Sequence, residues 1–321
     1  MTVGWLVEQG IGEERALRYT GGRAVAARLR WPGALEAGTV EDAVLVERHQ
    51  GSARGVARFA SGEEALVDRL PPQASEGAAL RLEVTRAALR ERGRGKRAQA
   101  RPTAVVPRPA PSLLDSVPNA AAVRRFPDDA WNEVWAEAWE GETRFAGGSL
   151  HFAATPAMTL IDIDGTLPAR ALALSAVPAL SEALGRLDLA GSIGIDFPTL
   201  PERADRKAVD CALGDALAGW DHERTAMNGF GFVQIVARQA HPSLLHRLAF
   251  DRAGAAARKL LRDAEGLEGA GAVLLTAHPA VIAAMPPAWT AELARRTARD
   301  VRIAADAAVA LGAGHAQIVP R

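Results

Sequence analysis

The order of apolar segments after Gly147 constrains the fold of this 321-residue chain more than any other feature. Apolar runs at 158–163, 192–197 and 231–236 alternate with segments whose apolar residues recur every three or four positions. The runs predict buried strands and the spaced residues predict helices. The alternation continues to residue 319, so we expect an α/β or α+β body from residue 146 onward, with its own core.

The first part of the chain has a different pattern. Residues 1–100 contain short alternating strands separated by Gly, Pro and Ser, which predict a small barrel of the oligonucleotide-binding kind. The segment 101–145 begins with the Pro- and Ala-rich composition of a linker. It ends in a predicted helix with Trp131, Trp135 and Trp139 on one face, a spacing typical of core packing. We therefore predict a multidomain α+β protein.

Charge is balanced overall but not locally. The chain has 38 Lys+Arg and 38 Asp+Glu, yet between Arg86 and Arg101 seven basic residues accompany one acid, Glu91. Such a run attracts phosphates even on a neutral chain. A solvated linker explains the run equally well.

Two of the apolar runs end in acids. Asp162 lies in LIDID at 160–164, with Asp164 two residues on, and Asp196 lies in GIDF at 194–197. A carboxylate at the end of a buried strand loses hydration unless a cation meets it. Two such acids on neighbouring strands predict a divalent metal site, and oxygen ligands favour Mg²⁺ or Mn²⁺. Alternatively, each acid caps a helix or pairs with an arginine.

Three segments around these acids carry a family resemblance. GGSLHFAATPAMTLIDID, LAGSIGIDF and FGFVQIVARQAHPSL follow one another in that order. Together they resemble the catalytic block of the ribonuclease E/G family over about 146–248. The resemblance is weaker at both ends of the chain. It implies an N-terminal S1/OB-like part (1–100), a reduced RNase H-like or sensor region (101–145), a DNase I-like catalytic subdomain (146–248) and a small C-terminal α/β subdomain (249–321).

The resemblance also implies a function, the Mg²⁺-dependent endonucleolytic hydrolysis of single-stranded RNA. Asp162 and Asp196 match the two aspartates that hold the metal, and Asp164 replaces an asparagine of the family and adds charge beside the site. Arg238 matches an arginine that we expect to contact RNA near the metal. The other predicted RNA contacts are Arg94, Lys96, Arg97 and Arg206.

Several departures from the family pattern limit what the resemblance implies. The paired zinc-binding cysteines have no counterpart, since the only cysteine is Cys211, so we expect neither a structural zinc nor a zinc-linked tetramer. A homodimer is implied by the family alone. The sensor region is too short to predict a preference for 5′-monophosphorylated RNA. Phe59 lies one place from an S1 stacking position and Ala65 occupies the second.

Two alternative functions stay open. DIDGTL at 162–167 is the nucleophile motif of haloacid-dehalogenase-like phosphatases, for which Thr276 could supply the second motif. A non-catalytic RNA-binding protein derived from such a nuclease is the other. NGFGFVQI at 228–235 approximates the RNA-contact strand of an RRM, but the order of elements does not fit, and we interpret Phe232 as core.

The expected location is the cytoplasm, without a membrane partner. The N-terminus has no basic region followed by an apolar one, and no uninterrupted apolar window of spanning length occurs. The seven histidines show no metal-binding or triad spacing.

Overall fold

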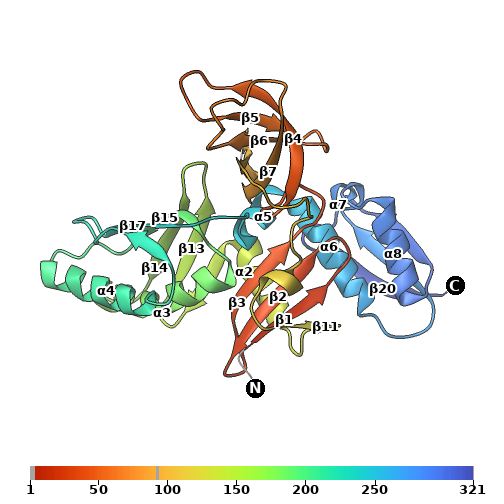
Figure 1. Cartoon of the computed structure of the whole chain (residues 1–321). Coiled ribbons are helices and arrows are strands. Elements are labelled where there is room, and N and C mark those ends of the chain that lie inside the picture. The colour runs from red at the N-terminus through yellow and green to blue at the C-terminus, as the bar shows by residue number, and fades with distance from the viewer. Residues whose placement is uncertain (1–3, 92–93, 321) are drawn as a thin grey trace.

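The computed structural model describes residues 4–91 and 94–320, and the side chains of Glu91 and Arg94 lie outside that description. Figure 1 shows a mixed α+β structure with a closed five-stranded β-barrel. The barrel stands at the top of that view, the sheet that carries the aspartates lies at the left, and the C-terminal sheet lies at the right. The predicted α+β class is confirmed, and the structure contains a closed barrel, but the barrel does not include all the strands of residues 1–100 from which it was predicted.

The first three strands lie outside the barrel. They are β1 (Gly4–Gln9), β2 (Glu14–Thr20) and β3 (Arg23–Arg30), and they form a four-stranded sheet with β11 (Ala120–Val123) in the order β11-β1-β2-β3. Strand β11 pairs parallel to β1, although the barrel separates the two in sequence. The barrel is therefore an insertion between two strands of one sheet.

The barrel has a core of its own. Its strands follow the order β10-β6-β5-β4-β7 and are β4 (Val40–Arg48), β5 (Gly55–Arg58), β6 (Glu64–Val67), β7 (Ala79–Arg86) and β10 (Ala98–Pro102). Leu45, Ala57 and Leu82 fill its interior. Phe59 is buried among them, so it does not present a ring to a ligand. A hairpin of β8 (Leu89–Glu91) and β9 (Arg94–Lys96) projects from the barrel between β7 and β10.

The tryptophan helix packs as predicted. After the short α1 (Leu113–Ser116), helix α2 (Ala130–Glu140) buries Trp131 and Trp135 in the main core. Trp139 is half-buried and stacks on Trp135 with ring centroids 4.6 Å apart. The stripe is a packing surface, which confirms the interpretation from helical spacing.

The central sheet has six strands in the order β12-β13-β14-β15-β17-β16. They are β12 (Glu142–Phe145), β13 (Gly148–Ala154), β14 (Thr159–Gly165), β15 (Gly191–Asp196), β16 (His222–Arg224) and β17 (Phe232–Ala237). Helices α3 (Ala169–Arg186) and α4 (Arg203–Ala216) lie below the sheet in Figure 1. Ile161, Ile163 and Ile195 join the buried core that includes α3. The residues that alternate with them, Asp162, Asp164 and Asp196, are exposed. One face of this sheet is therefore open.

The C-terminal part forms a separate small sheet. Helices α5 (Leu244–Phe250) and α6 (Arg252–Glu265) lead from the central sheet to it. Its order is β19-β18-β20, and its elements are β18 (Ala272–Ala277), α7 (Pro279–Ala283), α8 (Pro287–Thr297), β19 (Val301–Ala305) and β20 (His315–Val319). These elements match the predicted alternation in this region.

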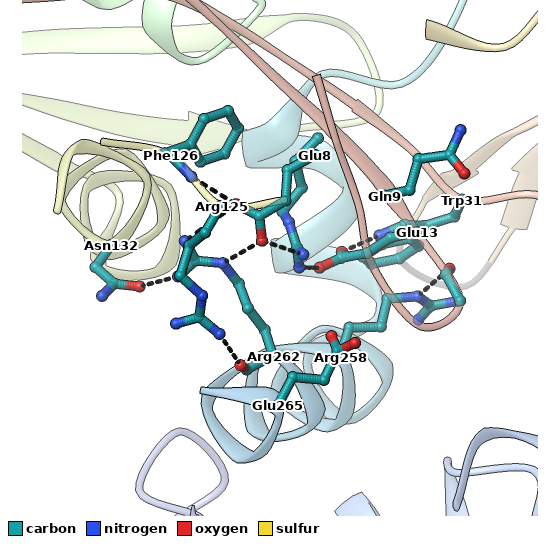
Figure 2. A network of polar contacts seen from close by, with 12 residues as sticks. Glu8, Gln9, Glu13, Trp31, Arg125, Phe126, Asn132, Arg258, Arg262 and Glu265 are labelled. Atoms are coloured by element: carbon teal, nitrogen blue, oxygen red, sulfur yellow. Dashed lines mark hydrogen bonds and ion pairs between the residues drawn. The ribbon is translucent and has the colours of Figure 1, made fainter. Parts of the chain in front are cut away.

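A buried polar network joins the N-terminal sheet to α6, as Figure 2 shows. The carboxylate of Glu8 accepts hydrogen bonds from Arg15 (2.6 Å), Arg262 (3.1 Å) and the backbone N–H of Phe126 (3.2 Å). Arg262 also donates to Asn132 Oδ1 at 3.0 Å, which ties in α2. Because Glu8, Arg15 and Arg262 are all buried, their charges are compensated by one another rather than by water.

No helix within 4–91 and 94–320 has both the length and the apolar character needed to cross a membrane.

Candidate functional site

The open face of the central sheet carries a row of four side chains across four strands. Asp162 of β14 is the direct partner of Asp196 in the parallel neighbour β15. His151 of β13 pairs with Asp162 on the other side, and Phe232 of β17 pairs with Asp196. Residues in register on neighbouring strands point to the same face, with backbones about 4.8 Å apart. The two predicted metal-binding aspartates therefore lie side by side.

Among the described residues, neither aspartate side chain has a hydrogen-bond or ion-pair partner. Over the residues that the structure describes, Asp162 and Asp196 make no side-chain hydrogen bond, and no basic side chain lies within 4 Å of them. Asp164, on the same face two residues along β14, accepts a hydrogen bond from the backbone N–H of Gly165 at 3.0 Å. Like charges directly opposite one another on a sheet repel. The row is thus an unneutralised anionic patch that a cation would stabilise.

The prediction that these acids end fully buried strands is wrong. Strand β14 alternates between buried and exposed residues, and Asp162, Asp164 and Asp196 are exposed. The apolar runs looked continuous because Leu160 and Gly194 occupy the open face next to the aspartates. Helices cover only the other face of the sheet. A cation site is therefore supported by the adjacency of two like charges and not by loss of hydration of buried carboxylates.

The residues fit a lightly ligated divalent ion. Among the described side chains, no three His, Cys, Asp or Glu residues come together as metal ligands. Mg²⁺ is commonly held by one or two carboxylates, with water and substrate phosphate completing its octahedron. Asp162 and Asp196 would supply those two carboxylates, and the open face leaves room for the remaining ligands.

Arg238 does not lie beside the aspartates. Strand β17 runs antiparallel to β15, so Ala237 pairs with Gly191 while Phe232 pairs with Asp196. Arg238 follows at the far end of the sheet, about 20 Å away along the strand. There it lines a cavity of about 430 Å³ together with Trp5 and Arg28. The prediction that Arg238 lies near the metal is wrong. It was based on the order of segments along the chain, which does not show that β17 runs antiparallel to β15.

Arg206 supports the loop after Asp196. Its guanidinium donates to the backbone carbonyls of Leu200 and Pro201, the latter at 2.7 Å. It is half-buried at the start of α4, on the segment that follows β15. These bonds fix the turn that leaves the aspartate row. A contact of Arg206 with RNA stays a prediction.

The predicted basic contacts lie on the barrel exit. Lys96 Nζ donates to the carbonyl of Pro156 at 3.0 Å, which links the β8–β9 hairpin to the β13–β14 turn. Arg97 forms an ion pair with Glu64 at 3.3 Å and remains half-exposed. The side chain of Arg94 lies outside the described residues. Glu83 pairs with Arg101 at 2.8 Å, so acids from the barrel partly neutralise this run.

Three residues of the site escaped prediction. His151 is exposed beside Asp162, and its Nε2 lies 2.9 Å from Ser149 Oγ. Phe232 is half-buried on the open face, against Gly194, and is not core as predicted. Phe230 is 82% exposed at the turn before β17. The RRM-like spacing of the two phenylalanines was a usable signal, but without the sheet it could not be told from core packing.

The residues of the phosphatase alternative do not come together. Asp162 lies in the central sheet, whereas Thr276 belongs to β18 of the C-terminal sheet. Lys259 lies on α6, where it binds Asp263 at 2.6 Å. The second motif of that mechanism is therefore not beside the first.

No protein-family model matches this chain, and no curated protein matches it either.

Proposed function

We propose that this protein is a metal-dependent endoribonuclease of the ribonuclease E/G type that cleaves single-stranded RNA. The observation that carries the proposal is the adjacency of Asp162 and Asp196, in register and unpaired on an open sheet face. In this proposal the central sheet is the DNase I-like subdomain and the barrel is the S1/OB-like part.

The chemistry follows from the row of side chains. Asp162 and Asp196 provide the oxygen ligands, and bound Mg²⁺ or Mn²⁺ supplies Lewis-acid polarisation of a phosphate oxygen together with activation of water. Asp164 adds negative charge on the same face, which strengthens the attraction for a cation. His151 stands next to Asp162 on the same face of the sheet.

The barrel exit gives a route for RNA. The hydrogen bond from Lys96 to Pro156 places the basic hairpin against the turn that leads into β14. A flexible unpaired strand can follow this hairpin onto the open face, whereas a duplex is too wide and stiff to lie along both. Contacts of this kind to phosphates weaken as salt rises.

The experiment that tests the proposal measures cleavage of a fluorophore-labelled single-stranded RNA with Mg²⁺ and with EDTA. We expect Asp196→Asn to slow cleavage by about a hundredfold or more, because it weakens binding of the metal ion that would stabilise charge at the reacting phosphate. Asp215→Asn is the matched control, since Asp215 is exposed on α4, on the covered side of the same sheet. That control should cut at the wild-type rate.

The other outcomes separate the alternatives. Tight RNA binding without cleavage by the wild type would support the non-catalytic RNA-binding protein. Turnover of a small phosphate ester that survives in Asp196→Asn would support the phosphatase. Equal cleavage by wild type and Asp196→Asn, or in EDTA, would contradict the proposed nuclease.

A further inference from the structure

Arg247 and Arg258 both lie over the ring of Trp31 in a cavity that contains none of the residues of the aspartate row. The cavity has a volume of about 350 Å³ and lies between the barrel exit, the turn after β3 and the α5–α6 junction. The guanidinium carbon of Arg258 lies 4.0 Å from the ring centroid of Trp31, and that of Arg247 lies 5.4 Å from it. Figure 2 shows Arg258 beside Trp31.

Arg247 has no counter-ion in the described structure. Its Nε is buried without a hydrogen-bond partner, and no described carboxylate forms an ion pair with it. The acids that act on it most strongly are each already paired with another arginine. These pairs are Glu36 with Arg30 (2.7 Å), Asp188 with Arg28 (2.7 Å) and Glu13 with Arg15.

Within the described residues, the hydrogen bonds of the Arg258 side chain all go to backbone carbonyls. Its guanidinium donates to Gly12 at 2.9 Å and to Gly254 at 3.0 Å. The acids in the cavity wall are Glu63 and Asp251. Asp251 accepts the backbone N–H of Gly254 at 3.1 Å as the cap of α6, and its other oxygen lies 3.8 Å from Arg90. The wall thus holds three arginines against two carboxylates.

This excess positive charge is costly without an anion. Burial lowers the pKa of Arg247 to about 10, and burial also lowers the pKa of Arg258. A guanidinium group stays charged at neutral pH. Acids act on both groups only from a distance, and no described carboxylate forms an ion pair with either, so partly dehydrated charge lies in the cavity wall. An anion in the cavity would restore the lost interactions.

We propose that this cavity is a phosphate-binding site, with Arg247 and Arg258 as its main ligands and Arg90 at its rim. The planar guanidinium group matches phosphate oxygens in pairs, which an ammonium cannot do. Pro242 and Phe250 give the cavity apolar walls that fit a nucleoside attached to the phosphate. The phosphate can belong to an RNA backbone or to a free nucleotide or phosphate ion. The site does not depend on the proposed nuclease activity.

The test measures binding by the full-length protein in EDTA, which prevents metal-dependent cleavage. Inorganic phosphate, AMP and a single-stranded RNA octanucleotide are titrated by calorimetry against wild type, Arg247→Met and Arg258→Met. We expect affinity to fall by about tenfold or more in Arg247→Met, the loss of one charge-assisted contact. Arg252→Met is the matched control, because Arg252 lies on α6, the helix of Arg258, and stacks on Trp139 outside the cavity.

Each result has a defined meaning. Arg247-dependent binding of the octanucleotide alone assigns the site to an RNA backbone, and Arg247-dependent binding of phosphate or AMP assigns it to a free ligand. Binding that is absent for all three probes, or equal in wild type and Arg247→Met, overturns the proposal.

Stability without ligand separates a binding role from a structural one. Arg247 Nε is buried without a partner, and its side chain makes no hydrogen bond to any residue that the structure describes, so ligand-free Arg247→Met should melt at or above the wild-type temperature. A clear loss of stability in this variant, with Arg258→Met retaining wild-type affinity, would assign the two arginines to the fold and reject the site.

Discussion

Asp162 and Asp196 show how backbone register can hold two like charges together. Because they are direct partners on parallel strands, their repulsion is present whenever the sheet is formed. Each is exposed, so hydration softens the repulsion without removing it. The pair is therefore an element of the site that works against the stability of the sheet until a cation binds.

The charge repulsion can be measured without any assay of activity. In EDTA, Asp162→Asn should be more stable than wild type by up to about 1 kcal/mol, because one charge of the pair is gone. Adding Mg²⁺ should raise the melting temperature of wild type and leave Asp162→Asn nearly unchanged, since a ligand stabilises only the state that binds it. An equal Mg²⁺ response in both proteins, measured by differential scanning calorimetry, would argue against an ion between these residues.

Phe230 is held exposed by its own turn. Asn228 Oδ1 accepts hydrogen bonds from the backbone N–H of Phe230 at 2.9 Å and of Phe232 at 3.0 Å. Gly231 adopts a φ of 93°, and its carbonyl accepts the N–H of Phe197. An exposed ring on the turn that leads into Phe232, the partner of Asp196, is suited to stack on an unpaired base.

Removing this ring should weaken RNA binding and leave stability unchanged. Stacking on one aromatic contributes about 1–3 kcal/mol, so Phe230→Ala should bind single-stranded RNA at least about tenfold more weakly. Fluorescence anisotropy with labelled RNA measures the effect, with Val106→Ala as the control for loss of an exposed apolar group on the linker. Unchanged affinity in Phe230→Ala would remove Phe230 from the RNA path.

At the scale of elements, the barrel is the most independent part of the chain. Its buried residues form a cluster separate from the main core, and both of its connections pass through a short region near residues 35 and 108. The basic hairpin β8–β9 belongs to it in sequence but reaches the central sheet through Lys96. The barrel is therefore expected to fold independently of the central sheet.

We expect a fragment of residues 34–110 to fold alone and to bind RNA by charge. Its affinity should fall steadily between low and physiological salt, because neutralised phosphates release counter-ions. Circular dichroism checks folding, and anisotropy at a series of salt concentrations checks binding. A folded fragment whose affinity does not change with salt would contradict an electrostatic grip.

At the scale of the whole molecule, the network around Glu8 connects three regions. It joins β1 and β2 to α2 through Asn132 and to α6 through Arg262. Burial opposes the ionisation of Glu8, but the nearby Arg15 and Arg262 outweigh it, and the pKa of the carboxyl lies below its ordinary value. The network therefore stabilises the fold most when Glu8 is charged.

Breaking this network from one side should be costly. Arg262→Met leaves the buried carboxylate of Glu8 with one arginine fewer, and we expect a loss of about 3–5 kcal/mol in the free energy of unfolding. Arg295→Met, which removes an exposed arginine paired with Glu292 on the surface, should change stability little. Urea denaturation compares the two variants, and similar losses would mean that burial of the pair is unimportant.

The same network predicts an acid dependence. A group whose pKa is lower in the folded state stabilises that state above its unfolded pKa, and this contribution is lost as pH falls. For Glu8 the loss begins below about pH 4.3, the value for a free glutamate. Urea unfolding between pH 3 and 6 should show a smaller acid effect in Glu8→Gln than in wild type. Identical pH profiles would show that another group dominates.

Much of the local structure was predictable because periodicity reports which faces are buried. The strand around Asp162, the helix marked by Leu180 and the tryptophan helix all follow from spacing that local geometry imposes. The buried strand predicted at 158–163 was wrong in one respect. A run of apolar residues cannot tell whether a second layer covers the other side of the sheet.

The sequence by itself predicted the kinds of elements and a barrel that precedes a body of alternating strands and helices. It also singled out Asp162 and Asp196 as candidate metal ligands. The tertiary structure alone decided that Asp162 and Asp196 are direct neighbours, that Arg238 lies at the opposite end of their sheet, and that no described carboxylate pairs with Arg247. Spacing along the chain encodes local burial, whereas strand order, strand direction and the partners of a charge arise only when distant segments pack together.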